Sequence, residues 1–238
     1  LLSTVTIKRL MFNHFQNTIT GWPGGKPGAD DSTSPERKSP TSKRVLIFSP
    51  HPDDDVVSMG GTFDRLVSQG HEVHIAYQVK GNIAVSDHDA LKFIEVSKDL
   101  FKNESKVPVS ELIKELKNNK PDKIDSQAVR NLKGFIRKSE AIAATRYIGI
   151  PDSNTHFLNL PFYDTGRIKK NPPTKKDVLI TASLINKIKP HQIFAAGDLE
   201  DPHGTHKVCL DIILEALETL KGEKFIKDCW LWLYRGAW

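Results

Sequence analysis

Cysteine is scarce in this sequence, and long apolar runs are absent. Two cysteines in 238 residues, Cys209 and Cys229, are too few for the disulfide framework of a small secreted domain. No stretch approaches the roughly 18 to 20 consecutive apolar residues that cross a bilayer, and the first residues contain no apolar run followed by a cleavage site. These absences argue against secretion and against a membrane partner. We therefore expect a reducing, cytoplasmic setting.

The balance of apolar and charged residues is typical of a globular protein with a packed core. Hydrophobic residues make up 38% and charged residues 26%, and the mean hydropathy is -0.39. The net charge is +5, but residues 1–44 hold seven Lys or Arg against three acids, so the remainder of the chain is nearly neutral. Binding to a nucleic-acid backbone needs cations clustered on one face. We therefore expect no nucleic-acid partner.

A change in composition near Ser42 divides the sequence. Residues 21–43 are dense in Gly, Pro, Ser and charge, a composition that predicts a flexible linker because it cannot bury enough apolar surface. The apolar residues within 4–20 are compatible with one short amphipathic helix or with the tail of a missing upstream domain. We expect residues 1–42 to be the tail of an upstream domain plus the linker, and residues 43–238 to form one domain.

From residue 44 onward, short β-branched or aromatic runs alternate with longer segments of helical period. This alternation is typical of βαβ units that build a mainly parallel sheet. Expected strands cover residues 45–49, 72–79, 192–196 and 229–234, and expected helices cover 56–69, 126–147 and 202–221. Asp201 is the predicted N-cap of the last helix. We predict an α/β fold with a mainly parallel sheet and helices on both faces.

An acidic turn follows the first expected strand, in the sequence Ser-Pro-His-Pro-Asp-Asp-Asp over residues 49–55. In an open α/β sheet, the carboxyl ends of the strands border the ligand-binding crevice. Adjacent carboxylates repel one another, and a divalent cation would compensate them. His51 and Asp54 are the natural pair of ligands, which leaves Asp53 free to act on a metal-bound water. We expect Asp55 to cap the following helix.

A second histidine-bearing turn, residues 201–206, follows the expected strand 192–196. His203 and His206 are three residues apart on the predicted helix, so both rings can converge on one point. Two histidines and one carboxylate from two strand-end turns, with one open position, form the ligand set expected of catalytic zinc. Each turn alone has a plainer explanation, as surface histidines or as an Asp-rich helix start. Their joint occurrence at strand ends favours a metal site.

Together the two turns resemble the signature of the PIG-L or LmbE-like de-N-acetylases, a His-Pro-Asp-Asp-Glu turn after the first strand and a late His-x-x-His. The matching residues are 51–54 and 203–206. The resemblance extends over about residues 44–236, because Arg-Lys-Ser-Glu at 137–140 is similar to the family's Arg-x-x-Glu helix. The sequence departs from the signature at Asp55, where the family usually has Glu.

The resemblance implies a Rossmann-like fold and one zinc ion held by His51, Asp54 and His206. It also implies that Asp53 is the base and that His203 assists. The implied reaction is hydrolysis of an amide by a zinc-bound water, which removes the acetyl group from an N-acetylglucosamine-type sugar. The implied partner is thus a small amino-sugar substrate.

The chain is also similar to the version of this module that is fused behind a glucosamine-6-phosphate deaminase-like domain, and residues 21–26 resemble the join. A protein of that kind can be named a glucosamine-6-phosphate deaminase through its upstream domain, whereas the residues present support amide hydrolysis. Two other classes stay open, a non-catalytic interaction module and a nucleotide-binding α/β protein. A purely structural metal site has no use for Asp53, and the acidic turn repels phosphate unless a metal intervenes.

Three further residues are candidate substrate contacts. Arg137 could donate a bidentate hydrogen bond to sugar hydroxyls or phosphate, or form a solvated ion pair with the Glu three residues later. Asp164 lies in an expected loop, where it binds sugar hydroxyls or shapes a turn. Asn82 follows the second expected strand and is expected near the crevice.

Overall fold

The computed structural model describes residues 3–8, 11, 42–100, 109–118, 123–167, 169–198 and 204–236. Residues 21–41 of the predicted linker lie outside the described residues, as do Asp201 and His203. Within the described part, no helix combines the length and the apolar content needed to cross a bilayer.

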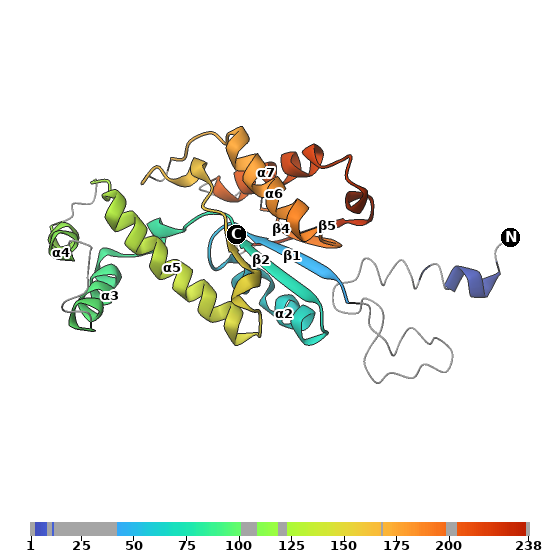
Figure 1. Cartoon of the computed structure of the whole chain (residues 1–238), viewed down its shortest axis with the longest axis horizontal. Coiled ribbons are helices and arrows are strands. Elements are labelled where there is room, and N and C mark those ends of the chain that lie inside the picture. Colours follow the sequence, from blue (N-terminus) through green and yellow to red (C-terminus); the bar gives the residue numbers. More distant parts are fainter. Residues whose placement is uncertain are drawn as a thin grey trace.

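Five parallel strands form one sheet in the order β3-β2-β1-β4-β5 (Figure 1). The strands are β1 (Arg44–Ser49), β2 (Glu72–Tyr77), β3 (Thr155–Phe157), β4 (Gln192–Ala196) and β5 (Trp230–Tyr234). β1 lies at the centre, between β2 and β4. Its apolar run is fully buried, as expected of a parallel strand covered on both faces. The predicted parallel sheet is confirmed.

Helices cover both faces of the sheet, as the sequence predicts (Figure 1). They are α2 (Asp54–Ser68), α3 (Asp87–Leu100), α4 (Val109–Lys117), α5 (Gln127–Tyr147), α6 (Lys175–Ile188) and α7 (Thr205–Thr219). α6 and α7 pack on the face that carries Leu46 and Phe48. α2 and α5 pack on the opposite face, against Val45 and Ile47. Side chains that alternate along β1 therefore enter two separate cores.

A third, smaller core joins α3 and α4 to α5. Its buried members include Ile94 of α3, Leu112 of α4 and Val129 of α5. Figure 1 shows α3 and α4 beside the first part of α5, away from the sheet. The sequence interpretation did not include α3, α4, α6 or β3.

Two predicted helix starts differ from the structure. α2 begins at Asp54, two residues before the predicted start, and Asp53 occupies its N-cap position. α7 begins at Thr205, because Gly204 adopts a left-handed φ of 67° that does not continue a helix. The helix thus begins three residues after the predicted start at residue 202. The expectation that His203 and His206 lie on one helix face involves His203, which lies outside the described residues.

The sheet order places the two histidine-bearing turns next to each other. β1 pairs with β2 on one side and with β4 on the other, so the strand order reverses at β1. Ligands of open α/β sheets bind at such a reversal, outside the carboxyl ends of the strands. The acidic turn follows β1, and the segment that leads to α7 follows β4. Both predicted motifs thus belong to the carboxyl ends of neighbouring strands.

Candidate metal centre

Three side chains that the sequence predicts as metal ligands lie close together at the reversal of strand order: His51, Asp54 and His206. His51 Nδ1 lies 3.2 Å from Asp54 Oδ2, and His206 Nε2 lies 3.2 Å from His51 Nδ1 and 3.3 Å from Asp54 Oδ2. Two imidazoles and one carboxylate are donors that zinc binds in catalytic sites. In the part of the chain that the structure describes, this is the only group of three or more such residues placed to hold a metal ion.

Asp54 is held in the ionised form that a metal ligand requires. Burial by itself raises the pKa of Asp54, but hydrogen bonds with His206 and His51 outweigh burial and hold this pKa well below its usual range. The Asp54 carboxylate also accepts a hydrogen bond from the backbone N–H of His51 at 2.8 Å. The charge, the donor atoms and their spacing therefore fit a divalent cation.

Asp198 supports the cluster from the far side of His206, and the sequence interpretation missed it. His206 Nδ1 lies 3.0 Å from Asp198 Oδ2, and the backbone N–H of Gly236 donates to Asp198 Oδ1 at 2.7 Å. A carboxylate on one ring nitrogen fixes the tautomer, so the other nitrogen keeps its lone pair for a metal. Asp198 is the second residue after β4, a strand-end position that could have revealed it.

Asp55 does not serve as the predicted helix N-cap. It lies inside α2 and is fully buried, where its carboxylate accepts hydrogen bonds from the hydroxyls of Tyr77 at 2.9 Å and Ser49 at 3.2 Å. Burial raises the pKa of Asp55 to about 6, against the effect of these two hydrogen bonds. The N-cap prediction failed because the helix already begins at Asp54, so the Asp55 side chain faces the core.

Asp53 precedes the candidate ligand Asp54 and pairs with Arg137. Arg137 Nη2 lies 2.7 Å from Asp53 Oδ2, and Arg137 Nη1 donates to Glu140 Oε2 at 3.1 Å. Arg137 thus forms the ion pair with Glu140 that the sequence offered as an alternative to a substrate contact. It also pairs with Asp53, the predicted general base. The Asp53 side chain is 49% exposed, so solvent and a small ligand can reach its carboxylate.

Asn82 is buried at the start of the short 3-10 helix η2 (Asn82–Ala84). The residue before it, Gly81, has a left-handed φ of 64°. A Cβ at Gly81 would lie 2.8 Å from Pro52 Cδ and 3.4 Å from Arg137 Nε, so only glycine allows this close approach. The segment that carries Asn82 therefore packs against the acidic turn and Arg137.

Asp164 follows the 3-10 helix η4 (Pro161–Tyr163) and forms ion pairs with two basic side chains. Its carboxylate lies 3.2 Å from Lys80 Nζ and 3.4 Å from Arg130 Nε. η4 also brings Tyr163 to the candidate metal centre, where its ring stands edge-on to the His51 ring at 5.9 Å. The sequence interpretation missed Tyr163, because no motif spacing marks it.

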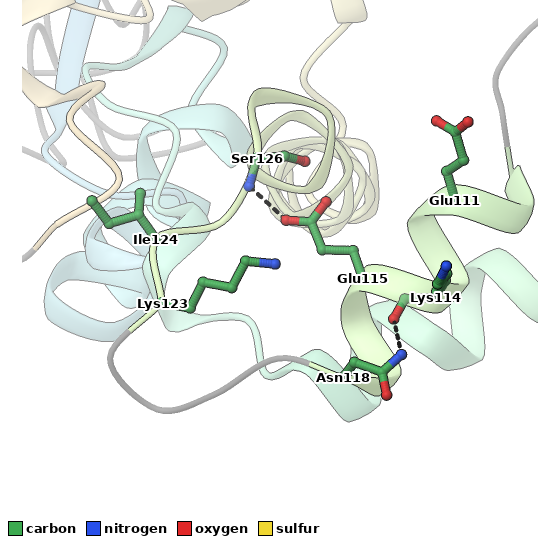
Figure 2. A pocket seen from close by; sticks show the side chains of 7 residues that line it. All are labelled: Glu111, Lys114, Glu115, Asn118, Lys123, Ile124 and Ser126. Carbon is green, nitrogen blue, oxygen red and sulfur yellow. Dashed lines mark hydrogen bonds between the residues drawn. The ribbon is translucent and has the colours of Figure 1, made fainter.

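A shallow groove of about 460 Å³ lies between α4 and the segment that enters α5 (Figure 2). Glu115 Oε1 accepts a hydrogen bond from the backbone N–H of Ser126 at 2.8 Å, which ties α4 to the N-cap residue of α5. None of the predicted site residues lines this groove. The groove is therefore separate from the candidate metal centre.

The fold and the site together define an α/β protein with a cluster of metal-ligand side chains at a reversal of strand order. The family model described as PIG-L, GlcNAc-PI de-N-acetylase, matches residues 46–217, which include both histidine-bearing turns. The chain therefore belongs to the PIG-L family, as the resemblance in its sequence predicts.

Individual relatives differ in how much of their length this chain spans. A glucosamine-6-phosphate deaminase-like protein of Bacteroides thetaiotaomicron is 52% identical over 99% of this chain, which spans 37% of that relative. Among solved structures, the conserved protein TT1542 of Thermus thermophilus is 16% identical, with 82% of this chain and 67% of that chain covered at a TM-score of 0.49. The zinc-inhibited form of the teicoplanin deacetylase Orf2 is 18% identical, with 82% and 68% covered at a TM-score of 0.44.

Proposed function

We propose that the chain hydrolyses the acetamide group of an N-acetylglucosamine-type sugar, with zinc held by His51, Asp54 and His206. The observation that carries this proposal is the convergence of these side chains, from turns 155 residues apart, beside the half-exposed carboxylate of Asp53. A zinc ion held there would polarise the amide carbonyl and lower the pKa of a water molecule. Membership of the PIG-L family supports the reaction class.

Asp53 is the proposed general base. Its exposed carboxylate can reach a water molecule beside the ligands, and the Arg137 guanidinium at 2.7 Å orients it. The proton that Asp53 accepts can then pass to the departing amine. Asp198 keeps the His206 ring in place throughout. We propose that His203 assists the reaction, as the resemblance to the family implies. His203 lies outside the described residues.

Arg137, Asn82 and Asp164 are the proposed substrate contacts. All three belong to segments that border the centre, because Gly81 packs against Arg137 and Tyr163 contacts His51. Carboxylate, amide and guanidinium groups together offer donors and acceptors for sugar hydroxyls. The deaminase chemistry in the name of the Bacteroides relative is not part of this proposal.

Metal analysis and an acetate-release assay test the proposed function. Asp53→Asn should keep zinc and lower turnover roughly 100- to 10,000-fold, whereas His206→Ala should lose both zinc and turnover. Asp152→Asn, at an exposed carboxylate paired with Arg146, is the matched control and should keep both. Bound zinc without turnover on any acetamido sugar would instead identify an interaction module. Undiminished activity of Asp53→Asn would exclude Asp53 as the base.

A further inference from the structure

Three cationic side chains gather near the candidate metal centre, and we call them the basic cluster: Lys80, Arg130 and Lys170. Lys80 and Arg130 approach the two oxygens of Asp164, at 3.2 and 3.4 Å. Lys170 follows in the same loop as Asp164. The negative charge of Asp164 favours the protonated form of Lys170. Segments after β2, on α5 and after η4 therefore contribute one cation each.

The basic cluster is linked to the candidate metal centre through one aromatic side chain. Lys170 Nζ lies 3.7 Å from the centre of the Tyr163 ring. The same ring lies 5.9 Å from the ring of the ligand His51. A small molecule that contacts the metal ligands is therefore within reach of Lys170.

The basic cluster carries more positive charge than its surroundings neutralise. Among the described residues, Asp164 is the only carboxylate within 4.0 Å of Lys80 or Arg130, and none lies within 4.0 Å of Lys170 Nζ. Lys170 instead donates to the carbonyl of Arg167 at 2.6 Å. Three cations thus face one carboxylate, which leaves an excess of two positive charges.

Polar atoms of this region are buried without a hydrogen-bond partner. Arg130 Nε and Asp164 Oδ1 are shielded from solvent and face each other at 3.4 Å as an ion pair without a hydrogen bond, and Arg137 Nε is buried with no hydrogen-bond partner among the described residues. Buried polar atoms that lack a hydrogen bond are rare because each costs free energy. Burial also lowers the pKa of Lys170 to about 8, against the opposing effect of Asp164, so a bound anion would favour its charged form.

We propose that the substrate of the candidate metal centre carries a phosphate monoester, which binds to the basic cluster. This inference rests on the proposed function and names its substrate class. A phosphate monoester carries about 1.5 to 2 negative charges at pH 7, which matches the excess of two. Lysine ammonium groups bind phosphate as point charges. With the phosphate on Lys80 and Lys170, the acetamide group of the same sugar can reach His51 past Tyr163.

Acetate release from matched sugars tests the inference. For the wild-type protein, we expect kcat/KM to be at least about tenfold higher for N-acetylglucosamine 6-phosphate than for N-acetylglucosamine, a difference of about 1.4 kcal/mol. Lys170→Gln should lower this ratio about tenfold, and Lys170→Arg should retain most of it. Lys169→Gln removes an exposed charge from the same loop and should leave the ratio unchanged. An unchanged ratio in Lys170→Gln, or an equal loss in Lys169→Gln, would overturn the inference.

Calorimetric binding separates this inference from the proposed function. On metal-free protein, glucosamine 6-phosphate should bind and glucosamine should not, and Lys170→Gln should abolish the difference. This result supports a phosphate site even if no acetamide is hydrolysed. Equal binding of both sugars would overturn the inference while leaving acetate release intact. Binding to vesicles that contain phosphatidylinositol phosphate, without binding of the phosphorylated sugar, would also overturn it and assign the cluster to a lipid headgroup.

Discussion

The ring of His206 owes its orientation to one buried carboxylate. The Asp198 carboxylate accepts a hydrogen bond from His206 Nδ1 at 3.0 Å, which leaves the lone pair of Nε2 available to a metal ion. We expect Asp198→Asn to weaken zinc binding about 10- to 100-fold, because an amide can present the wrong group to the ring. Competition against a chromogenic chelator measures this affinity. Asp211→Asn, at an exposed position of α7, is the control, and equal affinities in the two variants would contradict the prediction.

Residue types could predict the three side chains that meet at the candidate metal centre but not the residues that support them. His51, Asp54 and His206 stand in short motifs at strand ends, where chemistry and position point the same way. Asp198 is fixed by a backbone N–H 38 residues later, at Gly236, and no local spacing records that contact. Tyr163 reaches His51 only through the path of the chain around η4.

The buried carboxylate of Asp55 depends on Tyr77. The Tyr77 hydroxyl donates to Asp55 Oδ2 at 2.9 Å, and both side chains are almost fully buried. Tyr77→Phe removes this donor and leaves a buried carboxylate with the Ser49 hydroxyl as its remaining side-chain donor. We expect the free energy of unfolding in urea to fall by about 1 to 3 kcal/mol. Tyr147→Phe, at a side chain that is 91% exposed, should leave stability unchanged; an equal loss there would refute the argument.

At the scale of elements, two histidines hold the start of the central strand. His71 Nδ1 accepts the backbone N–H of Lys43 at 3.1 Å, and His191 Nδ1 accepts the backbone N–H of Arg44 at 3.0 Å. Each imidazole must carry a lone pair at Nδ1 to accept these hydrogen bonds. Protonation would therefore weaken the attachment of β1.

Acid should destabilise the fold through His71. Burial, together with the charge of Lys43, lowers the pKa of His71 to about 4, whereas an unfolded imidazole titrates near 6.5. The unfolded chain binds the proton first, so this stabilisation is complete above about pH 6.5 and is lost as the pH falls towards 4. The slope from this one group is at most about 1.4 kcal/mol per pH unit.

Urea unfolding between pH 7.5 and 4.5 checks the contribution of His71. His71→Gln removes one titrating group and should reduce the slope of the unfolding free energy with pH, while His156, whose pKa burial also lowers to about 4, keeps its own contribution. His88→Gln, at an exposed position of α3, is the control and should follow the wild type. If His71→Gln keeps the full wild-type slope, the proton is taken up elsewhere.

Helices and strands with a clear pattern of apolar residues could be predicted from the sequence, and short or irregular elements could not. β1 and β4 match their predicted ranges within one residue, because their apolar runs are continuous and bounded by turns. β3 has three residues, too few for a period to emerge. α6 did carry a signal that was missed, since Val178, Ala182 and Ile185 lie on its buried side.

At the scale of the whole molecule, topology brings the site together. His51 and His206 are 155 residues apart and lie 3.2 Å apart between ring nitrogens. The sequence could predict this meeting because the carboxyl ends of parallel strands share one edge. It did not predict that α7 begins after Gly204, because the left-handed φ of 67° at that glycine is a backbone conformation that no spacing of residues in the sequence records.

A metal that joins two distant turns should stabilise the entire fold. A ligand that binds only the folded state raises the free energy of unfolding by about 4 kcal/mol when its concentration is about 1,000 times its Kd. For a domain of this size, that corresponds to an increase in Tm of about 10 °C, measured by thermal unfolding with zinc and with EDTA. His206→Ala should abolish the increase, whereas Asp53→Asn should keep it, because Asp53 is not one of the three clustered ligands. An equal shift in His206→Ala would place the stabilising zinc outside this cluster.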